Sequence, residues 1–475
     1  MFLLSSIFPI SMAILSYIFN KYHKIFILIS YIGIFISLII SKTPQSYIPG
    51  DWSSSNGIEF FFDNEIKIVL ICFMFFSAFI YLRFFKNKNH EFTLLWLILN
   101  GSLNSFFMSR DFFNIYVHIE LISMIVFLIL AMDKDSTRIW ISLKYMLMSS
   151  VALNFYLIGV GMFYSNTGTL NITLSLEFSK PLFSQSFIIT GLLIKSGVFF
   201  LSGWLPSAQS EASEGVPSIL SGIVEKIGLW VIYLIFPLLT FEVKNFLLYF
   251  GIISAILSSI FTFLQIDLKK LLAYSTMTQM SYGLIIIAVR PEFFPIFLIY
   301  DMFSKGILFL LADDLNEKFG SKNLEKLKNV KISIVPYIIF FILLFNIGGV
   351  FPSNLYKLKS SLIIPLIIEV NIFIFGMYFT KLFKTFHISK KFGFKYLYLL
   401  LVTPVILYIT YIKYNFEISK ITYQYLLFFG GVIFYLLIFK KIKFKPINIY
   451  SFENSLIYQI AFLLIFFIIE SLSRI

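Results

Sequence analysis

Several charged residues of this chain fall inside strongly apolar stretches, where ionisable groups are rare and usually serve transport. They are Glu120, Lys195, Lys226, Asp301, Lys305 and Glu369. Burial disfavours the charged form of such groups, and an approaching opposite charge restores it. A Glu–Lys pair that opens and closes can therefore load and release protons. The alternative is a set of static ion pairs that hold helices together.

Spacing suggests partners for some of these groups. Asp301 and Lys305 are four residues apart on one helical face, which allows an internal pair. Glu225 and Lys226 are adjacent and point in different directions, so we expect Lys226 to find its partner on another element. His118 also lies within an apolar stretch, and we interpret it as a packing residue.

The apolar stretches must form the framework that positions these groups. Of the 475 residues, 59% are hydrophobic and 13% charged, which excludes an ordinary soluble enzyme and a disordered chain. About sixteen stretches approach the roughly 20 residues that cross a bilayer, and none alternates like a barrel strand. The fold class is therefore all-α and polytopic. The stretches lie near 3–19, 25–41, 66–82, 92–108, 112–132, 139–164, 184–203, 216–238, 245–265, 271–289, 292–312, 332–350, 361–380, 396–412, 422–439 and 454–472.

Basic residues indicate how these spans are oriented. The net charge is +13, and most lysines and arginines fall in connections after odd-numbered spans. The positive-inside rule places those connections in the cytoplasm and both termini outside. Basic loops at a membrane surface account for the positive charge, so we predict no nucleic-acid partner. The connection 204–215 is an exception, because it has two glutamates and no basic residue. Either the span count is wrong there or the stretch is buried.

Two spans are interrupted by proline and glycine. Trp204 and Pro206 end the seventh span, Pro217 precedes the eighth, and Gly349 and Pro352 break the twelfth. Interrupted spans in two parts of a transporter are typical of an ion site, although ordinary loops would look similar. With one cysteine, Cys72, and no cofactor motif, we predict no metal site, no cofactor and no catalytic residue.

In order along residues 50 to 365, these motifs resemble the antiporter-like subunits shared by respiratory complex I and the multisubunit (Mrp-type) cation/proton antiporters. The segments Leu143–Tyr145 and Gly168–Asn171 are most similar to the D subunit of the Mrp type. The other matching segments are Gly50–Trp52, Gly57–Glu59, Asp111–Glu120, Ile194–Lys195, Trp204–Pro206, Ser221–Gly228, Asp267–Lys270, Ala273–Gly283 and Lys305–Phe309.

The resemblance implies about 14–16 transmembrane helices with two inverted helix repeats, each containing a discontinuous helix. It implies that Glu120 and Lys195 form a coupling pair and that Lys226 and Lys305 form a central relay. It also moves Lys359, which hydropathy leaves in a connection, into a broken helix as the exit-side residue. Asp301 lies where the family commonly has histidine.

Three further departures accompany Asp301. Gln209 replaces a histidine, Phe351 replaces a proline, and Glu225 is an unusual acid beside the relay lysine. Asp301 and Glu225 either compensate for the missing histidines or trap the lysines in permanent pairs.

These features favour a proton-translocating subunit of a multisubunit monovalent cation (Na+)/H+ antiporter. We expect N-terminal helices in 1–110, an antiporter-like core in 111–390 and C-terminal helices in 391–475. The expected location is the bacterial inner membrane, with other membrane subunits, protons and monovalent cations as partners. Such a chain is not an enzyme by itself. The alternatives are a proton-pumping subunit of an NADH-quinone oxidoreductase or membrane hydrogenase, and a non-conducting scaffold.

Overall fold

The computed structural model describes residues 1–85, 88–132, 135–177, 181–328, 330–351, 353–360, 362, 365–389 and 418–438. The expected spans 396–412 and 454–472, and Pro352, lie outside the described residues. The helices are α1 (Leu4–Ile18), α2 (His23–Ile40), α3 (Asn64–Ile80), α4 (His90–Met108), α5 (Phe112–Ala131), α6 (Ser136–Thr167), α7 (Leu182–Lys195), α8 (Leu205–Glu211), α9 (Val216–Ile219), α10 (Lys226–Ile235), α11 (Phe241–Leu264), α12 (Leu268–Val289), α13 (Phe294–Phe319), α14 (Ile334–Gly348), α15 (Asn354–Ser360), α16 (Pro365–Thr385) and α18 (Ile418–Leu437).

Capping residues explain where several helices begin and end. The side chains of Asp63, Asp111 and Asp267 accept a hydrogen bond from the backbone N–H three residues later, at the starts of α3, α5 and α12. Gly168 and Gly320 end α6 and α13 in the left-handed conformation, which glycine adopts without a steric penalty. The boundaries are therefore set by local chemistry as well as by hydropathy.

Eight helical segments in the described part of the chain are long and apolar enough to cross a membrane, and four shorter helices are apolar. The eight are Asn20–Ile40, Asn64–Arg83, Phe112–Ala131, Ser136–Thr167, Val216–Leu238, Phe241–Leu264, Leu268–Val289 and Pro291–Phe319. The molecule is thus an all-α, polytopic membrane protein, as the composition predicts.

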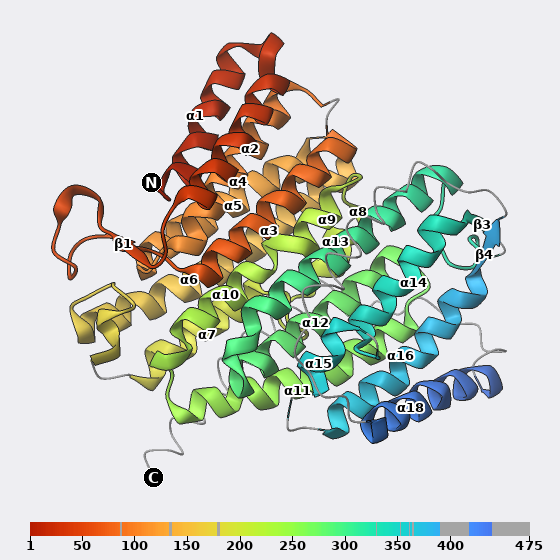
Figure 1. The fold of residues 1–475 in the computed structure, drawn as a ribbon. Coiled ribbons are helices and arrows are strands. Elements are labelled where there is room, and N and C mark those ends of the chain that lie inside the picture. Colours follow the sequence, from red (N-terminus) through yellow and green to blue (C-terminus); the bar gives the residue numbers. More distant parts are fainter. Residues whose placement is uncertain are drawn as a thin grey trace.

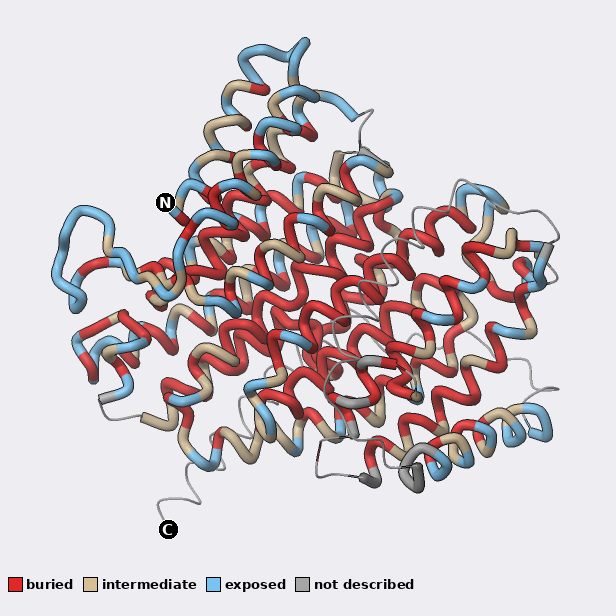
Figure 2. Tube along the Cα trace, in the orientation of Figure 1, coloured by how far each residue is buried: buried red, intermediate tan, exposed pale blue. Residues whose placement is uncertain are grey.

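The helices form an elongated array in which sequence order is largely kept in space (Figure 1). Helices α1 and α2 lie at one end beside α4, and α16 and α18 lie at the other. The central helices are mostly buried, whereas α1, α2 and α18 expose much of their surface (Figure 2). In the most apolar 18-residue stretch of Pro291–Phe319, 94% of the residues are buried, against 33% in that of Asn20–Ile40. Helix α13 is therefore central and α2 is peripheral.

Ion pairs at one end of the helices join the connections that were predicted to share the cytoplasmic side. We call them the inner-end cluster, formed by Arg83, Glu211, Lys269, Asp313, Asp314 and Lys322. The exceptional connection 204–215 belongs to it, because Glu211 pairs with Lys322 and the Gly215 N–H donates to Asp313 at 2.8 Å. Glu211 of this connection is thus matched by a cation of a neighbouring segment, and the span order needs no change there.

Connections after even-numbered spans meet at the opposite end. The Asn171 amide donates to Glu59 at 2.8 Å, and the Tyr233 hydroxyl donates to Glu65 at 3.0 Å. Arg110 lies over the Phe61 ring, 5.3 Å from its centroid. The grouping of connections into two sets therefore agrees with the alternation read from the sequence.

Two short strand pairs lie at the ends of this bundle. Strands β1 (Gln45–Tyr47) and β2 (Phe60–Phe62) pair antiparallel, with Gln45 opposite Phe62. Strands β3 (Val330–Ser333) and β4 (Phe386–Ser389) pair parallel, with Val330 opposite Phe386. Neither was expected from hydropathy, since three- or four-residue strands carry too little pattern to detect.

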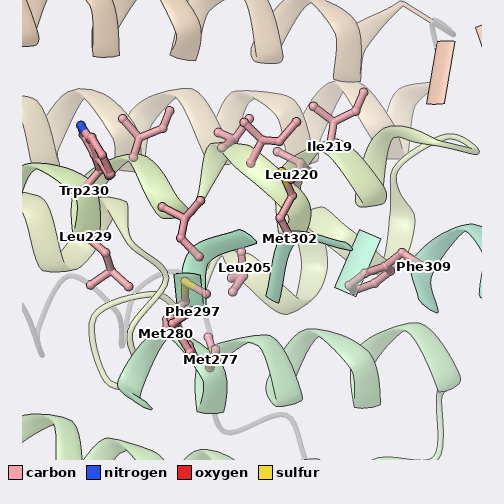
Figure 3. Close-up of a cluster of buried hydrophobic side chains, with 14 of the residues drawn as sticks. Leu205, Ile219, Leu220, Leu229, Trp230, Met277, Met280, Phe297, Met302 and Phe309 are labelled. Carbon is pink, nitrogen blue, oxygen red and sulfur yellow. The ribbon is translucent and has the colours of Figure 1, made fainter. Parts of the chain in front are cut away.

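The centre of the bundle is a closely packed apolar core between α9, α10, α12 and α13. Figure 3 shows side chains such as Leu220, Trp230, Met280 and Phe297 filling this region. All four are less than 2% exposed. Polar groups in this part of the protein are thereby surrounded by hydrocarbon, where an ionisable side chain needs a partner.

Candidate functional site

The break between α7 and α8 holds the first buried lysine. Lys195 is the last residue of α7 and is 3% exposed. Residues 196–204 are not helical, and Gly197 and Phe200 adopt positive φ angles of 73° and 66°. Pro206 occupies the first turn of α8, where its missing N–H costs no hydrogen bond. The lysine cation thus lies at a helix C-terminus, which the helix dipole favours.

Three hydroxyl groups surround the Lys195 ammonium, and we call them the hydroxyl cage. Lys195 Nζ donates to Ser123 Oγ at 2.6 Å, Ser149 Oγ at 2.7 Å and Tyr145 Oη at 3.2 Å. Trp204 packs edge-on against the Tyr145 ring, with the ring centroids 5.3 Å apart, and this contact holds the phenol in place. An ammonium has three N–H donors, so the cage satisfies all of them.

Glu120 does not complete this site in the observed conformation. It is half-buried on α5, one helical turn before Ser123, and no ion pair joins it to Lys195 in the described part of the chain. It does lie close enough to interact electrostatically with Lys195. The expected pair is therefore open here, and its coupling role stays a prediction.

Lys226 forms its ion pair with a residue on another helix, as expected from the sequence. Its Nζ lies 2.8 Å from Asp301 Oδ2, and the two side chains are 2% and 0% exposed. The internal Asp301–Lys305 ion pair that the spacing allows is not among the ion pairs of the described residues, because Asp301 reaches from α13 to Lys226 at the start of α10. We call Lys226–Asp301 the central pair.

A π-helical turn precedes Lys226. It spans Leu220–Val224 between α9 and α10, and Pro217 lies in the first turn of α9. Lys226 Nζ also donates to the Ser221 carbonyl at 2.5 Å. Inserted π turns are frequent at functional sites because they free backbone groups for other contacts. This deviation could not be recognised from hydropathy.

Lys305 lies further along α13 and is completely buried. It donates to Ser275 Oγ and, at 3.3 Å, to the Leu272 carbonyl of α12. The residue after Ser275, Thr276, shares a 3.0 Å hydrogen bond with Ser221 beside the central pair. Hydroxyl groups of α12 therefore lie between the two relay lysines, and they are functional candidates that the sequence reading missed.

The break between α14 and α15 holds the last buried lysine. Gly349 follows α14 with φ 67°, and Lys359 lies on α15, where the resemblance placed it. Lys359 Nζ donates to the Ile347 carbonyl at 2.8 Å and lies 4.0 Å from the centroid of the Tyr282 ring. A Cβ on Gly349 would meet the Lys359 side chain at 2.6 Å, so this glycine makes room for the lysine.

Buried ionisable groups thus run across the middle of the bundle, from the α7/α8 break through α10 and α13 to the α14/α15 break. Lys305 interacts electrostatically with Asp301, Lys226 and Lys359. A fold of this kind defines a polytopic membrane protein with a line of buried lysines and carboxylates. The structure brings five predicted residues into that line, Lys195, Lys226, Asp301, Lys305 and Lys359, and leaves Glu120 at its margin.

Comparison with known proteins gives the family. The family described as "NADH:quinone oxidoreductase/Mrp antiporter, TM" matches residues 109–385, which is more than half of the chain. The chain belongs to this family, as the ordered motifs indicate.

Two curated relatives represent both branches of the family. The D subunit of the Na(+)/H(+) antiporter of Bacillus subtilis is 26% identical over 345 residues, covering 68% of this chain and 70% of the relative. The M subunit of the NADH-quinone oxidoreductase of Rickettsia prowazekii is 26% identical over 423 residues, covering 81% and 86%.

Two solved structures share the fold. A chain of the membrane-bound sulfane sulfur reductase, an archaeal respiratory membrane complex, has a TM-score of 0.77 at 18% identity, covering 90% of this chain and 97% of that one. A chain of the Mrp complex from Dietzia sp. has a TM-score of 0.71 at 19% identity, covering 82% and 80%.

Proposed function

We propose that this chain is the proton-translocating subunit of a multisubunit monovalent cation (Na+)/H+ antiporter in a bacterial inner membrane. The observation that carries this proposal is the line of buried lysines between the two helix breaks. Each lysine has a partner that can hold it charged or accept its proton: the hydroxyl cage, the central pair, Ser275 and the Ile347 carbonyl. A set of purely structural ion pairs would not leave three of the four lysines on neutral oxygen partners.

Proton movement along this line needs alternation between charged and neutral lysines. A proton on Lys195 is released when the hydroxyl cage is the only partner and is held when the Glu120 carboxylate approaches. Proton transfer from Lys226 toward Asp301 neutralises the central pair, and Lys305 and Lys359 then pass the charge to the α14/α15 break. We expect other subunits in the complex, since the Bacillus subtilis relative is named as one subunit of a Na(+)/H(+) antiporter.

The test is antiport by the whole complex, expressed from its operon in everted vesicles of a salt-sensitive host. We expect Na+-dependent proton movement that is lost in Glu120→Ala and Lys195→Ala. Preserved antiport in both variants would contradict the proposal. The exposed Glu242, in the first turn of α11, provides the control Glu242→Gln, which should retain wild-type antiport.

A second candidate is a proton-pumping subunit of an NADH-quinone oxidoreductase-type complex. The observation that favours it is the longer alignment with the Rickettsia prowazekii relative, which reaches 86% of that chain against 70% for the antiporter relative. Purification of the native complex distinguishes the two. Flavin and iron–sulfur absorbance with NADH oxidation would favour the dehydrogenase, and colourless small membrane subunits would favour the antiporter.

A further inference from the structure

Glu225 is a buried carboxyl group that the proposed relay does not use. It is 0% exposed, and its Oε1 accepts a hydrogen bond from the Gln209 amide of α8. Its other oxygen, Oε2, is buried without a hydrogen-bond partner. An unpaired buried carboxylate oxygen is costly, so such a group is rarely kept without a role.

Glu225 lies between the Lys195 site and the Lys226 site. Its side chain packs at the α7/α8 break, since a Cβ on Gly197 would lie 3.8 Å from Glu225 Cγ and 3.9 Å from Oε2. Lys195, at the same break, is two residues before Gly197. Tyr145 of the hydroxyl cage interacts electrostatically with Glu225, although it belongs to α6.

Polar and charged groups on several neighbouring elements interact with Glu225. They are Gln209 on α8, Tyr145 on α6, Lys226 on α10, and Asp301 and Lys305 on α13. The set therefore contains the central pair on one side and the hydroxyl cage on the other. Glu225 thus interacts with a member of the hydroxyl cage and with the central pair.

We propose that Glu225, held by Gln209, is the proton carrier that connects the Lys195 hydroxyl cage to the central pair. This inference rests on the proposed proton-translocating function and adds a residue to its path. Gln209 is a positioning residue, because its amide fixes one carboxyl oxygen and leaves Oε2 available.

The proton balance of this step is simple. After Lys226 has passed its proton toward Asp301, the neutral Lys226 amine takes the proton of the Glu225 carboxyl group. The O–H bond of Glu225 breaks and an N–H bond of Lys226 forms, which leaves a carboxylate and an ammonium. Glu225 is reprotonated from the Lys195 ammonium through the Tyr145 hydroxyl, which releases its own proton as it receives one. No oxidant or cofactor is needed.

The alternative is that Glu225 only ties α8 to the π turn through Gln209. Glu225→Gln separates the two roles, since it keeps the size and hydrogen-bonding capacity of the side chain but cannot carry a proton. Glu369, a half-buried carboxyl group on α16, gives the matched control Glu369→Gln. The amount of assembled complex in the membrane is measured for each variant to check that it folds.

The experiment measures proton flux of the purified whole complex in proteoliposomes. We expect Glu225→Gln to lower flux by about a hundredfold, the usual size of one lost proton-transfer group, and Glu225→Asp to recover part of it. Glu369→Gln should match the wild type. Wild-type flux in Glu225→Gln, with flux lost in Lys226→Ala, would overturn this inference alone. Wild-type flux in Lys195→Ala and Lys226→Ala as well would overturn the proposed function.

A spectroscopic signature adds a readout that a structural role would not move. Infrared difference spectra of the complex after a pH jump should contain the C=O band of a carboxyl group that gains or loses a proton. We expect the Glu225 contribution to this band to disappear in Glu225→Gln and to remain in Glu369→Gln. An unchanged band in Glu225→Gln would contradict proton carriage by Glu225.

Discussion

At the scale of residues, the central pair gives Asp301 a partner. The resemblance implies a histidine at this position, and Asp301 pairs here with Lys226 at 2.8 Å, with both side chains almost fully buried. A buried pair can be strongly destabilised by removing one partner, because the other charge is left uncompensated. The pair is nevertheless adjacent to Lys305, Ser221 and Thr276, so the charge on Lys226 has other groups to which it can pass.

The first prediction concerns this pair. Asp301→Asn should lower proton flux by about a hundredfold or more, because an amide cannot accept the Lys226 proton and one proton-transfer group is typically worth about 10²–10⁴-fold. Asp301→His should retain part of the flux, because imidazole can also exchange a proton with Lys226. Flux in proteoliposomes measures both. Equal flux in Asp301→Asn and the wild type would show that the carboxylate only packs.

At the scale of elements, close helix contacts place the relay groups. A Cβ on Gly228 would lie 2.3 Å from Ser196 Oγ and 2.5 Å from the Leu192 carbonyl, so α10 touches the end of α7. A backbone carbonyl cannot move aside as a flexible side chain can. This glycine therefore keeps Glu225 and Lys226 beside the α7/α8 break.

The second prediction is that Gly228→Ala destabilises the protein and reduces flux together. Overpacking of this kind costs about 1–3 kcal/mol, and the displaced α10 would carry the central pair away from α7. Gly161 on α6 is the control, because a Cβ there meets no atom within 4 Å. Thermal unfolding of the purified complex gives the stability. A stable, fully active Gly228→Ala would mean that the contact is dispensable.

The third prediction compares two ion pairs of the inner-end cluster. Asp313 is 0% exposed and pairs with Lys269 at 2.5 Å, whereas Lys322 is 28% exposed and pairs with Glu211. Asp313→Ala should destabilise by about 3–5 kcal/mol because Lys269 stays buried and unpaired. Lys322→Ala should cost less than about 1 kcal/mol, as exposed pairs do. Equal shifts in the unfolding temperature of the two variants would argue against this difference.

Much of this element arrangement could be predicted from the sequence. Hydropathy located most of the described helices and placed Lys195, Lys226 and Lys305 within spans, and the resemblance added Lys359. The seventh expected span was too long, because it ran to residue 203 whereas α7 ends at Lys195. Which groups pair could not be predicted, because Asp301 to Lys226 is a contact between helices that spacing along α13 does not contain. The hydroxyl cage was missed for the same reason: its three members are ordinary helix residues until α5, α6 and α7 meet.

At the scale of the whole molecule, the two ends of the bundle carry different connections. Residues of the inner-end cluster belong to connections after odd-numbered spans. At the other end, Glu59, Glu65 and Arg110 belong to connections after even-numbered spans. The buried lysines lie between them, in the middle of the bundle. Under the proposed function, a proton that crosses from one end to the other passes these lysines.

The fourth prediction concerns orientation in the membrane. In a Cys72→Ser background, a cysteine at exposed Ser54 should react with a membrane-impermeant maleimide in intact cells. A cysteine at exposed Lys318 should react only in everted vesicles. The labelling patterns would be reversed if the basic connections faced outward.

The central claim is that protons cross this molecule through its buried lysines. The most direct test is proton flux through the purified whole complex in proteoliposomes, compared between the wild type, Lys226→Ala and the exposed control Glu242→Gln. The account predicts that Lys226→Ala assembles but loses flux by about a hundredfold, while Glu242→Gln matches the wild type. Undiminished flux in an assembled Lys226→Ala complex would contradict it.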